Sequence, residues 1–88
     1  MANTASAIKR VRQESKRRAR NRAVKSRMRT FVKQANEAIE QGDRALAADA
    51  VRNAISEIDR AASKGVIHSN NASRSKSRLM LRFNVLSE

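Results

Sequence analysis

The sequence contains no cysteine, proline, tryptophan or tyrosine, and only two glycines. Without cysteine, the chain can form neither a disulfide framework nor a thiolate metal site. Phe31 and Phe83 are the only aromatic residues, so we do not expect nucleobases to stack on an aromatic platform. No apolar run approaches the roughly 20 residues of a membrane span. The first residues also lack the apolar core of a secretory signal.

Acidic residues are almost absent from the first third of the chain. Residues 1–33 carry twelve lysines or arginines and one acid, Glu14, whereas residues 34–63 carry three bases and six acids. Residues 64–88 carry five bases and one acid, so most of the net charge of +12 comes from the first third. A block of like charge repels itself and is stabilised beside a polyanion. This pattern favours a nucleic-acid-binding protein.

The two glycines, Gly42 and Gly65, divide a sequence that is otherwise continuous in helical character. Glycine readily takes the left-handed conformation that ends a helix. We therefore predict three helices, at about residues 7–41, 44–64 and 70–86. We predict no strands, because β-branched or aromatic residues nowhere alternate over a useful length. The fold class is all-α, a single-domain bundle whose helices run up, down and up.

The first helix changes character at its middle. Its second half carries an apolar stripe at helical spacing, made of Val24, Met28, Phe31, Val32, Ala35 and Ile39. The same face in the first half carries only polar or charged residues: Arg10, Gln13, Glu14, Arg17 and Asn21. We therefore predict a bundle of residues 24–88 and a projecting segment of residues 1–23, which we call the arm. Like-charge pairs four residues apart disfavour an isolated helix, so we expect the arm to fray when free and to become helical on binding.

The candidate binding residues in this part of the chain are Lys9, Arg10, Arg12, Lys16, Arg17, Arg18, Arg20, Arg22, Lys25, Arg27, Arg29 and Lys33. They point to every side of a helix, which suits an arm lying between several phosphate backbones. A membrane-surface helix would need an apolar face along the basic segment, and the arm has none. A DNA-compacting protein remains open, because charge alone does not distinguish it. The basic start can also imitate an organellar transit peptide, but it continues directly into the apolar stripe, as one helix would.

Catalysis finds no support in the sequence, and we expect no metal, cofactor or small-molecule substrate. The single histidine, His68, precedes the third helix, where it can either cap that helix or contact a nucleic acid. We expect Asp43 to cap the second helix, and Ser69, Asn70 or Asn71 to cap the third. The acids of the second helix are expected outside its apolar face or at its edge: Asp49, Glu57 and Asp59. Leu79 and Met80 are expected on the inward face of the third helix.

Residues 64–79 read K-G-V-I-H-S-N-N-A-S-R-S-K-S-R-L. This stretch resembles the K-G-x-I-H-x-N-x-A-x-R-x-K-S-R-L signature of the bacterial small-subunit ribosomal protein 20 family. The start Met-Ala-Asn, the basic helix and the segment R-T-F-V-K at residues 29–33 are similar to that family as well. The resemblance covers essentially the full length of the chain.

The resemblance implies a three-helix bundle with a long first helix that binds 16S ribosomal RNA directly, at its 5′ domain and the penultimate stem. It implies a monomer within the small ribosomal subunit, without membrane contact, in a bacterial cytoplasm or an organelle. It also implies a second RNA-binding face within residues 64–78. The contacts expected there are Lys64, His68, Asn70, Arg74, Lys76 and Arg78. Lys76 lies within the inward stripe and should emerge at the end of the bundle.

Overall fold

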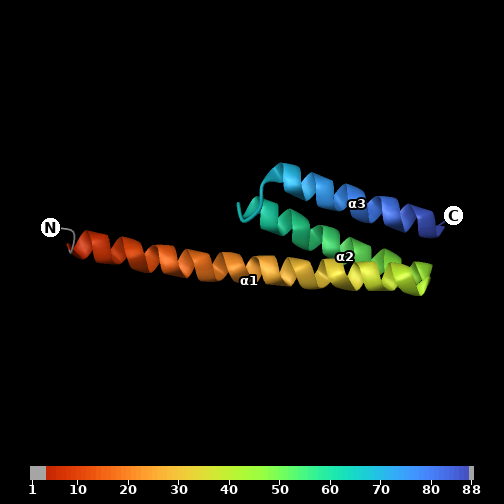
Figure 1. Ribbon diagram of the computed structural model, residues 1–88, viewed down its shortest axis with the longest axis horizontal. Helices are drawn as coiled ribbons and strands as arrows, with labels where there is room; N and C mark the ends of the chain where they lie inside the picture. The colour runs from red at the N-terminus through yellow and green to blue at the C-terminus, as the bar shows by residue number, and fades with distance from the viewer. Residues whose placement is uncertain (1–3, 88) are drawn as a thin grey trace.

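The computed structural model describes residues 4–87, and all of its regular elements are helices (Figure 1). Helix α1 spans Ala5–Gln41, α2 spans Arg44–Ser63 and α3 spans Ser69–Ser87. The predicted all-α class and the three helices are confirmed, and each predicted boundary lies within two residues of the observed one. The N-terminal Met-Ala-Asn that supported the family resemblance lies outside the described residues.

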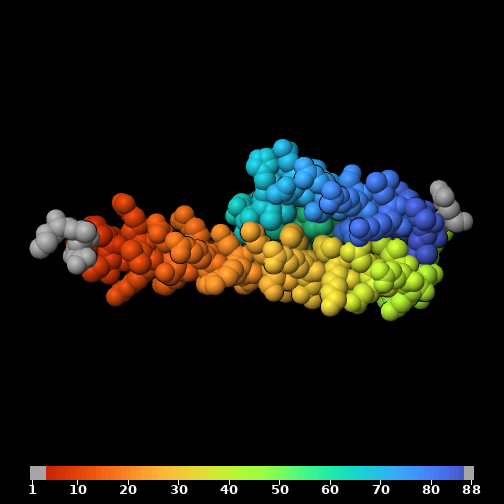
Figure 2. All heavy atoms as spheres, in the orientation of Figure 1, coloured from red at the N-terminus to blue at the C-terminus, as the bar shows by residue number. Residues whose placement is uncertain are grey.

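The helices run up, down and up, with α2 between α1 and α3 (Figure 1). Helix α1 has 37 residues, against 20 in α2 and 19 in α3. Its N-terminal half therefore has no helix beside it, and the molecule extends 65 Å along its longest axis but only 20 Å and 14 Å across. Figure 2 shows this half of α1 leaving the bundle as a narrow rod. The expected projection of the basic half is thus observed.

Gly42 ends α1 in the left-handed conformation, with φ of 79°. Its backbone N–H donates to the carbonyl of Ile39 at 3.1 Å. Asp43 then begins α2, because its side chain accepts a hydrogen bond of 3.2 Å from the backbone N–H of Leu46. The predicted cap at Asp43 is confirmed, and the tight turn fixes α2 antiparallel to α1.

The turn between α2 and α3 contains Gly65, with φ of 74°. The N–H groups of Gly65 and Val66 donate to carbonyls in the last turn of α2, which is the Schellman arrangement of a helix end. His68 begins α3: its Nδ1 accepts from the backbone N–H of Asn70 at 3.0 Å. The prediction that Ser69, Asn70 or Asn71 would cap α3 is therefore wrong, since the imidazole ring fills this role.

The core of the bundle is made mostly of small side chains. Its buried cluster consists of Ala35, Val51, Ala54, Ile58, Ala72 and Leu79. Met28, Phe31, Val32, Ile39 and Phe83 pack against this cluster and are partly buried, so most of the predicted stripe on α1 faces the core. Met80 is 39% exposed, so its predicted inward placement is wrong. Alanines at these positions allow the helix backbones to approach closely, which gives a thin bundle.

We predict that Ile58→Ala lowers the free energy of unfolding by about 2–5 kcal/mol. Ile58 is the largest fully buried side chain among the described residues. Ile55 on the same helix is only partly buried, so Ile55→Ala is the matched control and should cost about half as much. Urea denaturation of both variants checks this expectation. Equal losses would contradict the central position of Ile58.

Candidate nucleic-acid interface

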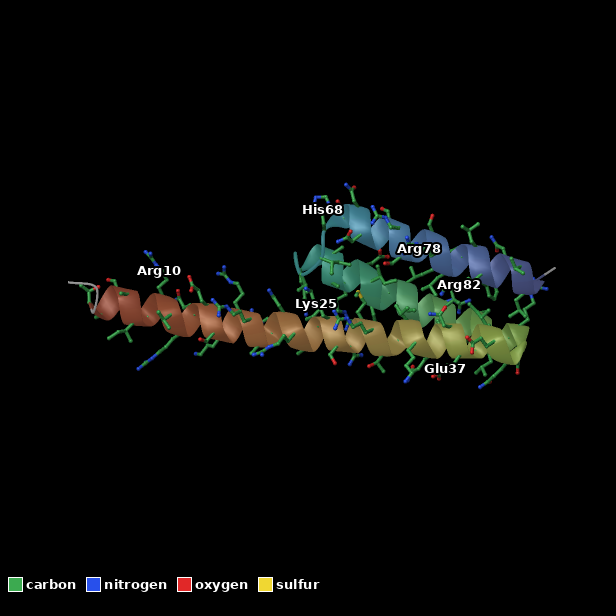
Figure 3. All side chains as sticks on the ribbon, viewed as in Figure 1. Arg10, Lys25, Glu37, His68, Arg78 and Arg82 are labelled. Atoms are coloured by element: carbon green, nitrogen blue, oxygen red, sulfur yellow. The ribbon has the colours of Figure 1, made fainter. Side chains whose placement is uncertain are left out.

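The basic residues of the first third are displayed on the surface of α1. All twelve are exposed except Lys25, which is half-buried. Within the described chain, Arg27 is the one member of this set whose charge is paired with a carboxylate. Figure 3 shows Arg10 on the arm, pointing into open solvent far from α2 and α3. The arm thus presents dense, uncompensated positive charge that attracts a polyanion.

The arm also exposes two apolar side chains, Ile8 at 50% and Val11 at 62%. These two residues are three positions apart and do not continue into an apolar face, because the next positions along that side of the helix are Glu14, Ser15 and Arg18. An amphipathic membrane-surface helix needs such a face. Among the helices that the structure describes, none is long and apolar enough to cross a membrane.

Arg27 is anchored at the start of the bundle. Its Nε donates to Oε1 of Glu57 at 3.0 Å, and its guanidinium carbon lies 5.2 Å from the centre of the Phe31 ring. Arg60 approaches the same Glu57 oxygen at 3.5 Å. The Arg27 side chain remains 58% exposed. It therefore joins α1 to α2 while still presenting part of its charge to the surface.

Glu57 itself contradicts the sequence-based expectation. We predicted it outside the apolar face of α2 or at its edge, but its side chain is only 8% exposed. It lies three residues after Ala54 and four before Ala61, both of which are buried. Helical spacing alone could have placed it inward. A buried carboxylate is stabilised only when it is paired, and the two arginines provide that pairing.

The second predicted face lies at the start of α3 and in the turn before it. Its members Lys64, His68, Asn70, Arg74 and Arg78 are all exposed. The imidazole Nδ1 of His68 accepts the capping hydrogen bond, so the helix-capping role predicted as one alternative for this residue is observed. Figure 3 shows His68 at the end of the bundle from which the arm projects, with Arg78 farther along α3. The start of the second face therefore lies at the same end of the bundle as the arm.

Lys76 differs from the other members of this face. Its Nζ lies 2.7 Å from Oδ1 of Asp59 on α2, and its side chain is 35% exposed. This ion pair joins α3 to α2. Lys76 is thus engaged within the bundle, and the structure does not show it emerging freely at the bundle end as expected. Arg82, which was not among the candidate residues, donates similarly from α3 to Asn36 of α1 at 2.7 Å.

Three acids gather at the end of α1, away from the arm. Glu37, Glu40 and Asp43 are exposed around the end of α1 and the turn that follows it. This is the opposite end of the bundle from the arm, as the position of Glu37 in Figure 3 shows. Nowhere within residues 4–87 do three or more His, Cys, Asp or Glu side chains gather in a way that could hold a metal ion. The arm is therefore rich in positive charge, whereas these three acids lie at the far end of the bundle.

A small helical bundle with a protruding basic helix is typical of nucleic-acid-binding proteins. A family model described as "Ribosomal protein S20" matches residues 2–84. The chain belongs to this family. The ribosomal family resemblance drawn from residues 64–79 is therefore confirmed.

Relatives in several bacteria share more than half of the aligned residues. The small ribosomal subunit protein bS20 of Geotalea daltonii is 56% identical over 87 residues, covering 99% of this chain and 100% of the relative. The bS20 protein of Thermomicrobium roseum is 54% identical, covering 98% of this chain and 87% of the relative. That of Sinorhizobium fredii is 54% identical, covering 99% of each. The chain is accordingly a structural component of the small ribosomal subunit and not an enzyme.

We predict that Glu57→Gln lowers the free energy of unfolding by about 1–3 kcal/mol, because two arginines lose their charged acceptor. Asp49→Asn is the matched control: Asp49 pairs with Arg52 at 3.7 Å, but both side chains are about three-quarters exposed. Breaking that exposed pair should change stability by less than about 1 kcal/mol. Thermal and urea unfolding of both variants provide the measurement. An unchanged free energy of unfolding for Glu57→Gln would show that the pairing of Glu57 with Arg27 and Arg60 adds nothing to stability.

Proposed function

We propose that this protein binds 16S ribosomal RNA directly and holds its folded 5′ domain and neighbouring helices in place during assembly of the small subunit. The observation that carries this proposal is the exposed and largely unpaired set of bases on α1. The ribosomal family of the chain and the names of its relatives support the small ribosomal subunit as the particle in which it binds. The bacterial origin of the relatives favours a cytoplasmic ribosome, and an organellar one is the alternative.

The mechanism that we propose is electrostatic. Arm bases that contact RNA phosphates displace condensed counterions, so affinity falls steeply as salt is added. Arginine is the commoner base in the arm, and its guanidinium can form forked hydrogen bonds to phosphate oxygens. Helical RNA offers mainly shape, phosphates and 2′-hydroxyls for recognition. The protein therefore positions folded RNA and does not read its bases one by one.

The proposed division of labour separates residues 1–23, which bind RNA, from residues 24–88, which form the supporting bundle. The exposed members of residues 64–78 extend the proposed binding surface onto the bundle, with Lys64, Arg74 and Arg78 as charged contacts. The protein is proposed to act as a single copy within the particle, as the family resemblance implies.

Binding to the folded 5′ domain of 16S RNA, measured across a salt series, tests the proposal. Duplex DNA and an unrelated structured RNA serve as competitors. Binding that survives both competitors supports a specific ribosomal RNA site. If every competing polyanion displaces the 16S RNA equally well, the protein is a general cationic binder, and DNA compaction becomes the favoured function.

We predict that the double variant Arg18→Gln, Arg22→Gln weakens binding to the 5′ domain and reduces the salt slope by up to about 1.8, or about 0.9 for each lost phosphate contact. The matched control is Arg44→Gln, Arg52→Gln, which removes the same charge from exposed positions on α2. The control should change the slope much less, because these arginines stand among the acids of the bundle. Identical slopes for the two double variants would refute the assignment of the arm as the RNA-binding element.

We also predict that RNA binding orders the arm. Hydrogen exchange of the free protein should be fast over residues 5–20, where like charges oppose the helix, and slow around Ala35, which is fully buried. Addition of the 16S fragment should slow exchange throughout the arm. An arm that is already protected in the free protein would contradict coupled ordering.

A further inference from the structure

A cavity of about 690 Å³ lies at the corner where the arm leaves the bundle. One wall comes from α1, with Arg17, Arg20 and Asn21, and the other from the turn after α2, with Lys64 and Gly65. In Figure 2, the turn stands over this part of α1 at the point where the molecule narrows. The volume falls in the range of roughly 300–1,000 Å³ that is typical of ligand sites. We call this cavity the corner cleft.

All of the charged residues that line the corner cleft are positive. Arg17, Arg20 and Lys64 all line it, whereas no carboxylate does. The three side chains are exposed, and none of them forms an ion pair within the described residues. A second cavity on α1 differs, because there Arg29 and Lys33 are accompanied by Glu37 and Glu40. The charge of the residues that line the corner cleft therefore favours an anion.

The turn that forms the second wall is held firmly by its backbone. The N–H of Gly65 donates to Ala62 at 3.0 Å, and the N–H of Val66 donates to Ala61 at 2.9 Å. Gly65 has no side chain, so a ligand backbone can approach the turn closely at this position. On the other wall, α1 is a continuous helix. Lys64 is thus presented from a defined position opposite the two arginines.

We infer that the corner cleft is one phosphate-binding site, in which Arg17 and Arg20 of the arm and Lys64 of the turn contact the same segment of RNA backbone. The inference rests on the proposed function and makes it more specific. It joins the arm and the segment after α2 into one composite site, whereas the sequence indicated two separate faces. Such a contact fixes the position of a strand without reading its sequence.

A double-mutant cycle on Arg20→Gln and Lys64→Gln tests the composite site, with binding measured on the folded 16S 5′ domain. Each single variant is expected to weaken binding about tenfold, as for a lost charge-assisted contact. Because both residues contact the same backbone segment, the double variant should fall well short of the hundredfold product. Arg10 is the matched control for Arg20, since it is an exposed arm residue outside the cleft. The Arg10→Gln, Lys64→Gln pair should give effects that multiply.

Phosphate ethylation interference on the same RNA locates the contact independently. Ethylation of one or two adjacent phosphates should weaken binding of the unaltered protein. Those same phosphates should lose their effect in both Arg20→Gln and Lys64→Gln, but keep it in Arg10→Gln. Melting curves of all variants confirm that the bundle is intact.

The outcomes separate this inference from the proposed function. If the protein prefers 16S RNA but the effects of Arg20→Gln and Lys64→Gln on affinity multiply, the composite site alone is overturned. The same holds if the two variants lose the ethylation effect at different phosphates. A protein without preference for 16S RNA over the competitors overturns the proposed function and the composite site together.

Discussion

The structure depends on one constraint: the first helix is nearly twice as long as either helix that can cover it. Its uncovered half has no apolar stripe to bury and almost no carboxylate to offset its charge. Burial in the bundle would strip water from many cations without pairing them, which costs several kcal/mol for each charge. The arm must therefore remain outside the core, and a polyanion is the chemical partner that can compensate it.

The bundle compensates for its small size by close packing and by a few specific polar contacts. Its core is dominated by alanine, with Ile58 as the one large side chain that is fully buried among the described residues. Three contacts then join different pairs of helices: Arg27 to Glu57, Lys76 to Asp59 and Arg82 to Asn36. Each of these bases comes from one of the two positively charged parts of the sequence, residues 1–33 or 64–88. Charge that would otherwise only repel is thus partly used to fix the helices relative to one another.

Periodicity and glycine positions sufficed to predict the helices, their order and the projecting arm, because these features depend on local spacing. The sequence did not reveal which charged residues turn inward. Glu57 lies at a buried spacing, but its charge argued for the surface until two arginines from different positions were seen beside it. Lys76 was assigned to RNA, although Asp59 on the neighbouring helix holds it. Such pairings depend on the rotation of one helix against another, which the spacing within a single helix does not determine.

The direction of the arm follows from the same pairings. Helix α1 contains neither glycine nor proline, so it has no built-in hinge between the bundle and the arm. Arg27 holds this helix to Glu57 shortly after the arm ends. An arm that grows from an existing helix also avoids the cost of nucleating a new one. Like-charge pairs, at about 0.2–0.5 kcal/mol each, oppose its extension, so the balance is close. A bound polyanion reverses the sign of that electrostatic contribution, and the helix then extends in a direction that the bundle has already set.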